Sequence, residues 1–173
     1  GLGITKVRLT GGEPLCRKGI VDLIARLSKL PGLQDLTLTT NGTLLAQKAQ
    51  ALKAAGLRRI NISLDTMDAA GFQRITGLDL LDTVWQGIHE AAAVGFNPVK
   101  INCVVMRGSN EDQLVPLAEL TRRHPFHVRF IEYMPIAVDP LTAQRRFMPM
   151  AEVQQRLEQL GTLMALPSKN GDG

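Results

Sequence analysis

Five short segments rich in β-branched residues alternate with helical segments along this chain. The strand-like segments cover residues 5–10, 34–39, 58–64, 98–105 and 126–132. Helical spacing of apolar residues follows over 20–30, 44–55, 80–94 and 111–123, and a shorter helix over 68–76 has Asp68 as its cap. Strands and helices in alternation predict a parallel sheet, so the expected fold class is α/β, as a barrel or a doubly wound sheet.

The two faces of every predicted strand differ in polarity, because successive side chains of a strand point to opposite sides. The apolar parity comprises Val7, Leu9, Leu36, Leu38, Ile60, Ile62, Leu64, Val99, Ile101, Cys103, Val128 and Phe130. The opposite parity comprises Lys6, Arg8, Thr10, Asp35, Thr37, Thr39, Asn61, Ser63, Asp65, Lys100, Asn102 and Arg129. Ordinary barrels have an apolar interior and doubly wound sheets are apolar on both faces. We therefore expect an open or wide barrel with a wet interior; an antiparallel sheet with one solvated face is the alternative, and the helical connections argue against it.

Three cations share the polar parity, namely Arg8, Lys100 and Arg129. Inside a barrel each would need an anionic neighbour, and phosphate is the usual ligand of such a cluster. Internal salt bridges are the alternative for any one of them, with Asp65 or Glu132 as candidate partners.

Composition narrows the class of protein further. The chain has 173 residues, a net charge of +4, and one Trp and one Tyr for base stacking, which disfavours a nucleic-acid surface. No apolar run is long enough for a membrane span and no secretory leader is visible, so a cytoplasmic protein is expected. The non-methionine start and the loop-like end indicate an internal fragment of a longer protein.

Each predicted strand is followed by a glycine-rich or polar segment, and these segments resemble the motifs of a known family. RLTGGEPL, TLTTNGTLL, INISLDT, VKINCVVMRG and VRFIEYMP occur in this order along the whole chain. Together they resemble the radical S-adenosylmethionine (SAM) superfamily and, within it, the GTP 3′,8-cyclases of molybdenum-cofactor biosynthesis.

The resemblance implies a partial (βα)6 barrel, of which this chain would hold strands two to six within residues 1–134. Residues 135–173 would hold a connector over 135–149, a helix over about 150–159 and the start of a C-terminal region. It also implies a lyase that cleaves SAM at a [4Fe-4S] cluster and uses the 5′-deoxyadenosyl radical to convert GTP to 3′,8-cyclo-7,8-dihydro-GTP.

Site residues are carried over by motif. The SAM-binding positions would be Gly12, Ser63 and Met134. The GTP-binding positions would be Arg8, Thr39, Lys100 and Arg129, with Asn102 as a weaker candidate. Their role would be positioning and charge neutralisation, because the radical chemistry belongs to the cofactor, and no catalytic residue is assigned.

The cysteine motifs of the family lie outside this chain. The parent protein would carry two [4Fe-4S] clusters, and we expect no metal ligand here. Cys16 and Cys103 match neither motif and are expected to be small core residues. The isolated fragment is expected to be inactive.

The partners that the resemblance implies are GTP, SAM, a reducing partner and the next enzyme of the pathway, and a homodimer is among the assemblies it allows. The alternatives are another radical SAM enzyme, such as a peptide-modifying maturase, or a non-catalytic phosphate-binding α/β module.

Overall fold

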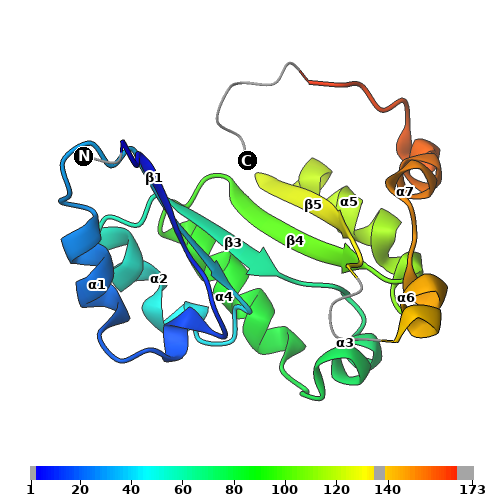
Figure 1. The fold of residues 1–173 in the computed structure, drawn as a ribbon, viewed down its shortest axis with the longest axis horizontal. Coiled ribbons are helices and arrows are strands. Elements are labelled where there is room, and N and C mark those ends of the chain that lie inside the picture. The colour runs from blue at the N-terminus through cyan, green and yellow to red at the C-terminus, as the bar shows by residue number, and fades with distance from the viewer. Residues whose placement is uncertain (1–2, 135–138, 167–173) are drawn as a thin grey trace.

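A five-stranded parallel sheet is the centre of the molecule (Figure 1). The computed structural model describes residues 3–134 and 139–166. The strands are β1 (Lys6–Leu9), β2 (Asp35–Thr40), β3 (Arg59–Ser63), β4 (Val99–Val105) and β5 (Phe126–Glu132), and they lie side by side in chain order. All neighbouring pairs are parallel, and β1 and β5 are the two edges. The α/β class and the open, partial barrel are therefore confirmed, and the antiparallel alternative is wrong.

Helices connect the strands and cover one face of the sheet (Figure 1). The α-helices are α1 (Ile20–Leu27), α2 (Leu45–Ala54), α3 (Ala69–Thr76), α4 (Leu81–Ala93), α5 (Leu114–Arg123), α6 (Pro140–Arg146) and α7 (Met150–Leu157). Single 3-10 turns occur at η1 (Pro14–Cys16), η2 (Glu111–Gln113) and η3 (Glu158–Leu160). No helix in the described part of the chain is both long and apolar enough to cross a bilayer.

Local sequence explains where several helices begin. Asp68 caps α3, because its carboxylate accepts a hydrogen bond from the Gly71 N–H at 2.6 Å, as predicted. Asp139 caps α6 through the Thr142 N–H at 2.9 Å, and Pro140 occupies the first helical position. Residues 139–149 were therefore predicted incorrectly as a plain connector, since the prolines that suggested a loop flank a short capped helix. The first part of that connector, 135–138, lies outside the described residues.

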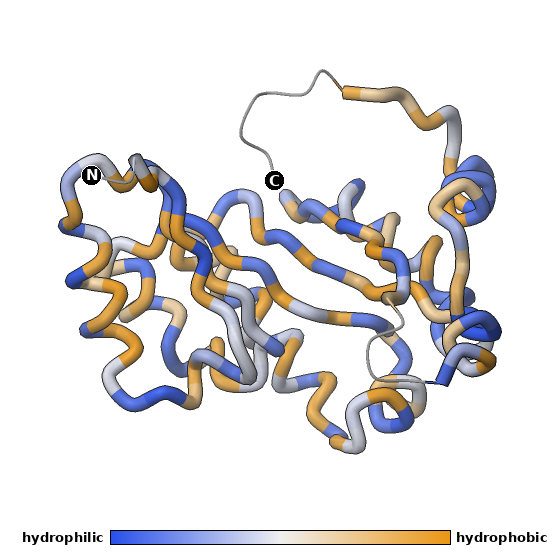
Figure 2. The backbone as a smooth tube through the Cα atoms, in the orientation of Figure 1, coloured by the Kyte–Doolittle hydropathy of each residue, from blue (hydrophilic) through white to orange (hydrophobic). Residues whose placement is uncertain are grey.

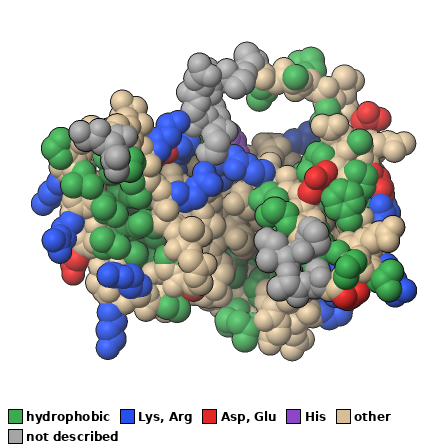
Figure 3. All heavy atoms as spheres, in the orientation of Figure 1, with side chains coloured by type: hydrophobic (Ala, Val, Ile, Leu, Met, Phe, Trp, Pro, Cys, Tyr) green, Lys and Arg blue, Asp and Glu red, His purple; other side chains and the backbone are tan. Residues whose placement is uncertain are grey.

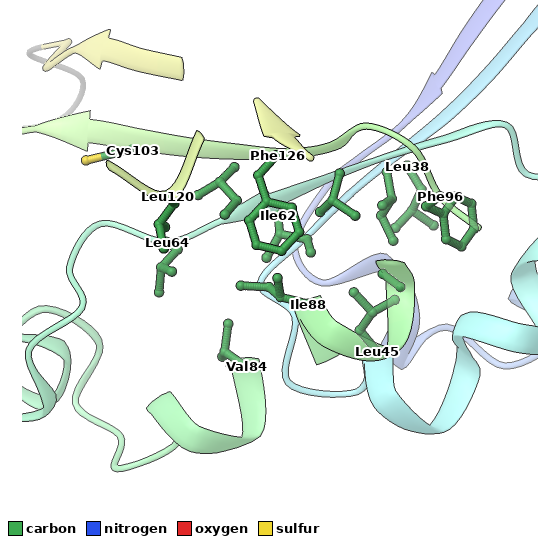
Figure 4. Close-up of a cluster of buried hydrophobic side chains, with 14 of the residues drawn as sticks. Leu38, Leu45, Ile62, Leu64, Val84, Ile88, Phe96, Cys103, Leu120 and Phe126 are labelled. Atoms are coloured by element: carbon green, nitrogen blue, oxygen red, sulfur yellow. The ribbon is translucent and has the colours of Figure 1, made fainter. Parts of the chain in front are cut away.

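The apolar parity of the strands forms the core between the sheet and its helices. The hydropathy of the chain alternates along the strands in Figure 2. Figure 4 shows the strand side chains Ile62 and Leu64 above Ile88 and Val84 of α4, with Leu38 farther along the same layer. All five of these side chains are almost completely buried. Burial of such side chains contributes about 1.5–3 kcal/mol each. The parity prediction is thus confirmed for the inner strands.

The edge strand β1 departs from this pattern. Val7 and Leu9 are half-buried, although they belong to the apolar parity. The reason is geometric, because β1 is an edge strand with a neighbour on one side only.

Candidate functional site

Three rows of polar side chains cross the face of the sheet opposite the core. Residues in register on neighbouring strands of a sheet point to the same side. Taken from the amino toward the carboxyl ends of the strands, the rows are Arg8–Thr37–Arg59, Thr39–Asn61–Lys100 and Ser63–Asn102–Arg129. The structure therefore brings the four predicted GTP-binding residues onto one face, with the predicted SAM residue Ser63 in the row nearest the carboxyl ends.

Within the middle row, Asn61 is hydrogen-bonded to Thr39. Its side-chain amide donates a hydrogen bond to the hydroxyl of Thr39 at 3.4 Å, and Lys100 follows on the next strand in register. Lys100 is only 9% exposed, which is unusual for a lysine and costly unless an anion is near. The row is thus a narrow polar strip that contains a buried cation and continues to His127 on β5.

Cations gather on this side of the molecule (Figure 3). The acid Asp35 pairs with Arg59 through both carboxylate oxygens. In the part of the chain that the structure describes, no ion pair joins Arg129 to a carboxylate. A half-buried guanidinium at the carboxyl end of a parallel sheet is suited to bind an anionic ligand.

The two acids considered as salt-bridge partners bind backbone groups. Oδ1 of Asp65 accepts the Val104 N–H at 2.8 Å, and Oε1 of Glu132 accepts the Met150 N–H at 2.7 Å. Burial raises the pKa of Asp65, and the hydrogen bond from Val104 partly opposes that rise. Asp65 thus joins the end of β3 to β4, and Glu132 joins the end of β5 to the start of α7.

Asn102 carries an unusual buried oxygen. Its Oδ1 is buried and has no hydrogen-bond partner among the described residues. An unpartnered buried acceptor costs about 1–3 kcal/mol, so it is a position where a ligand could donate an N–H or O–H. Asn102 lies in register between Ser63 and Arg129, which makes it a stronger site residue than the sequence indicated.

The glycine loop after β1 is open. A side chain added at Gly11 or Gly12 would meet no atom within 4 Å, and Gly11 has a φ of +146° that other residues rarely adopt. The loop backbone is therefore accessible to a ligand, as expected for Gly12.

Two cavities border the other predicted SAM residues. Ser63 lines a cavity of about 130 Å³ at the ends of β2 and β3, beneath Phe72 and Ile75 of α3. Met134 lines a larger, mainly apolar cavity of about 400 Å³ with Tyr133 and Phe147. Gly12 and Met134 follow opposite edge strands, so the structure does not bring these predicted SAM residues into one cavity.

The cysteines have different environments. Cys103 is buried, and burial together with the nearby Asp65 carboxylate raises its thiol pKa, so it is an inert core residue as predicted. Cys16 is exposed, which corrects the prediction of a core position, because it ends a 3-10 turn whose buried residue is Leu15. Over the described ranges there is no group of three or more His, Cys, Asp or Glu residues that could hold a metal ion.

Sequence reasoning missed the hydrogen bonds that organise the strand ends. Asn110 is completely buried, and its amide nitrogen donates to the carbonyl oxygens of Asp65 at 2.8 Å and Val104 at 2.9 Å. Glu13 similarly binds the end of β2. A polar residue next to a strand end was the available signal, but it does not specify its partner.

Comparison with known proteins shows what the chain is similar to. The model of the Radical SAM superfamily matches residues 1–121. A GTP 3′,8-cyclase of Pelotomaculum thermopropionicum is 48% identical over 172 residues, which are 99% of this chain and 53% of the relative. A GTP 3′,8-cyclase of Gloeobacter violaceus is 54% identical over 135 residues, which are 78% of this chain and 42% of the relative. The chain thus spans about half the length of the curated relatives it matches.

A solved structure supports the fold. A domain of pyruvate-formate lyase-activating enzyme from Bacteroides vulgatus aligns with a TM-score of 0.68 at 21% identity, covering 89% of this chain and 91% of that one. At this identity the likeness concerns the fold alone.

Proposed function

Because the chain belongs to the radical SAM superfamily, we propose that the full-length protein is a GTP 3′,8-cyclase, a lyase of molybdenum-cofactor biosynthesis. The observation that carries this proposal is the 48% identity over almost the whole chain to a protein named for that activity. The product would be 3′,8-cyclo-7,8-dihydro-GTP.

The polar rows support GTP as the substrate. Arg8, Lys100 and Arg129 would neutralise the triphosphate, and Thr39 would donate a hydroxyl to it. Arg8 and Arg129 lie in the outer rows and Lys100 in the middle one, so their charges are spread along the strand direction over two steps of about 6–7 Å each. Across the sheet, Arg8 on β1 is three strands, or about 14 Å, from Lys100 on β4, whereas Lys100 and Arg129 lie on adjacent strands. A single phosphate would not contact all three cations, so the proposed ligand is an extended polyanion.

We assign SAM to the residues at the strand ends. The open backbone at Gly12 would bind its methionyl group, Ser63 its ribose or carboxylate, and the apolar cavity at Met134 its adenine. When bound beside a [4Fe-4S] cluster, SAM supplies the 5′-deoxyadenosyl radical. As the family resemblance implies, the ligands of both [4Fe-4S] clusters of the parent protein would lie on segments other than this one.

The division of the chain into a barrel over 1–134 and the start of a C-terminal region over 135–173 is part of the same proposal. So are a cytoplasmic location, a homodimer, a reducing partner and a following pathway enzyme that consumes the product.

Reconstitution of the full-length protein tests the function. The protein is loaded with iron and sulfide without oxygen, reduced, and supplied with SAM and GTP. We expect SAM and GTP to be consumed together and a cyclised nucleotide to form. Consumption of SAM that does not depend on GTP would instead assign the barrel to another substrate, and loss of neither compound would contradict both assignments.

A further inference from the structure

The carboxylate of Glu13 lies between the two proposed ligand sites. Gly12, on the SAM side, precedes Glu13 in the chain. Thr39, on the GTP side, precedes Thr40, and the hydroxyl of Thr40 donates a hydrogen bond to Oε1 of Glu13 at 2.7 Å. One side chain thus connects the residues next to both sites.

Within the described part of the chain, the Glu13 carboxylate accepts three hydrogen bonds. Oε1 also accepts the Leu15 N–H at 2.9 Å, and Oε2 accepts the Asn41 N–H at 2.7 Å. The bond to Leu15 belongs to its own turn, whereas those to Thr40 and Asn41 cross to the end of β2. Short bonds from three donors to one ionised carboxylate are strong ones.

The bridge extends into β2. The oxygen of the Thr40 side chain accepts the Gly42 N–H at 3.1 Å while its hydroxyl donates to Glu13. Thr40 is only 2% exposed, so it is inaccessible to a ligand. The carboxylate therefore fixes the backbone from Thr40 to Gly42 through a buried hydroxyl.

Strand pairing does not extend over the glycine loop. The paired register of β1 and β2 ends at Leu9 and Leu38, before the loop begins. Gly11 and Gly12 have no neighbouring atoms where a side chain would be. Two features next to the loop therefore tie it to the sheet, the buried side chain of Leu15 in the following turn and the Glu13 carboxylate, and of these the carboxylate bonds directly to the end of β2.

We infer that Glu13 is a positioning residue that holds the SAM-binding loop and the GTP-binding end of β2 in one fixed arrangement, without contacting either ligand. This inference rests on the proposed function for the identity of the second ligand. It predicts that loss of the hydrogen bonds of Glu13 weakens the binding of both SAM and GTP, because the two sites share this support.

A direct contact between Glu13 and the ammonium group of SAM is the competing explanation. Substitution of Thr40 distinguishes between the two explanations. The substitution Thr40→Val removes the buried hydroxyl from the bridge but leaves the Glu13 carboxylate in place. If Glu13 positions the loop, Thr40→Val weakens binding as Glu13→Gln does. If Glu13 contacts SAM, Glu13→Gln weakens SAM alone and Thr40→Val changes neither affinity.

The test measures binding without turnover in the full-length, cluster-loaded protein. Calorimetric titrations give the dissociation constants of SAM and GTP for wild type, Glu13→Gln, Thr40→Val and Thr40→Ser. We expect the affinities for SAM and GTP both to fall about tenfold in Glu13→Gln and by a smaller factor in Thr40→Val. Thr40→Ser should bind both ligands as wild type does, because it keeps the hydroxyl. Thr121→Val, which removes an exposed hydroxyl bonded to a helix carbonyl at 2.8 Å, is the matched control and should bind as wild type.

Amide hydrogen exchange at Asn41 and Gly42 supplies a readout that does not need either ligand. Exchange should accelerate at these amides in Glu13→Gln and Thr40→Val and stay at the wild-type rate in Thr40→Ser. Unchanged exchange with a loss of SAM affinity in Glu13→Gln alone would overturn the inference. If wild type binds SAM but not GTP, the proposed function fails, while the exchange and SAM measurements still decide the role of Glu13.

Discussion

Arg107 and Glu152 form a two-point ion pair that joins the loop after β4 to helix α7. Nη1 of the guanidinium lies 3.1 Å from Oε1 of the carboxylate, and Nη2 contacts Oε2. The backbone N–H of Arg107 also donates to the carbonyl oxygen of Arg146 at 2.9 Å. One residue of the loop thus holds the ends of both α6 and α7 against the sheet.

Acid should release α7 from the sheet. The hydrogen bond from Arg107 holds the pKa of Glu152 below its ordinary value of 4.5, with a further contribution from Arg156. A carboxyl whose pKa is lowered by folding stabilises the fold above its unfolded pKa, and this stabilisation is lost as the pH falls through the lowered value. We expect amide exchange in α7 of the full-length protein, corrected for its intrinsic pH dependence, to accelerate below about pH 4.

Substitution at the same pair gives a check at neutral pH. Glu152→Gln should accelerate exchange in α7 at pH 7, because the neutral amide cannot replace the two-point contact. Glu119→Gln removes an exposed pair with Arg123, at 3.5 Å within α5, and should leave α7 unchanged. Equal exchange in α7 of wild type and Glu152→Gln would show that the ion pair does not hold the helix.

A close approach of α2 and α4 depends on Gly87. A Cβ at this position would lie 2.7 Å from the carbonyl oxygen of Gly42 and 3.0 Å from the Cβ of Leu45. Gly87→Ala should therefore destabilise the protein by about 1–3 kcal/mol despite the better helix propensity of alanine. Thermal unfolding of the full-length protein measures this, with Gln86→Ala on the exposed side of the same helix as the control. A melting temperature for Gly87→Ala at or above that of wild type would mean that the helices can move apart.

The strand pattern predicted the fold well because side-chain alternation in a sheet depends on local geometry. The polar parity of β2, β3 and β4 indicated the face on which Thr39 and Lys100 lie in one row. The same pattern could not predict that Asn61 would bond to Thr39, because that contact depends on register between strands.

The failures of the sequence predictions have physical causes of the same kind. The helix over 140–146 was missed because proline occurs both in loops and at helix starts, and Asp139 as its cap decides between them. Cys16 was placed in the core because free cysteines are usually buried, but its 3-10 turn buries Leu15 instead. Partners of Glu13 and Asp65 were beyond prediction, since each carboxylate bonds to a backbone 28 or 39 residues away.

The charge of Arg129 should matter for GTP binding. Arg129→Ala should weaken the binding of GTP by about 1–3 kcal/mol, because the proposed contact with a phosphate is a charge-assisted hydrogen bond. Lys100→Ala should have an effect in the same range, although the buried lysine also contributes to packing. Titration of GTP into the full-length protein measures both, and Arg58→Ala, an exposed arginine just before β3, serves as the control. Unchanged GTP affinity in Arg129→Ala would favour a different substrate for this barrel.

Substitution of Asn102 should affect ligand binding without lowering the stability of the protein. Its Oδ1 is buried without a partner among the described residues, so the folded protein without ligand bears a desolvation cost at this atom. Asn102→Leu, which keeps the branching of the side chain but replaces the amide by two methyl groups, removes that cost and should leave the melting temperature unchanged or raise it. It should also weaken the binding of whichever ligand donates a hydrogen bond to this oxygen, by about 1–3 kcal/mol, because the donor group of the ligand then has no acceptor. Thermal unfolding and separate titrations of SAM and GTP distinguish which ligand that is. A lower melting temperature with both affinities intact would show instead that the amide supports the sheet.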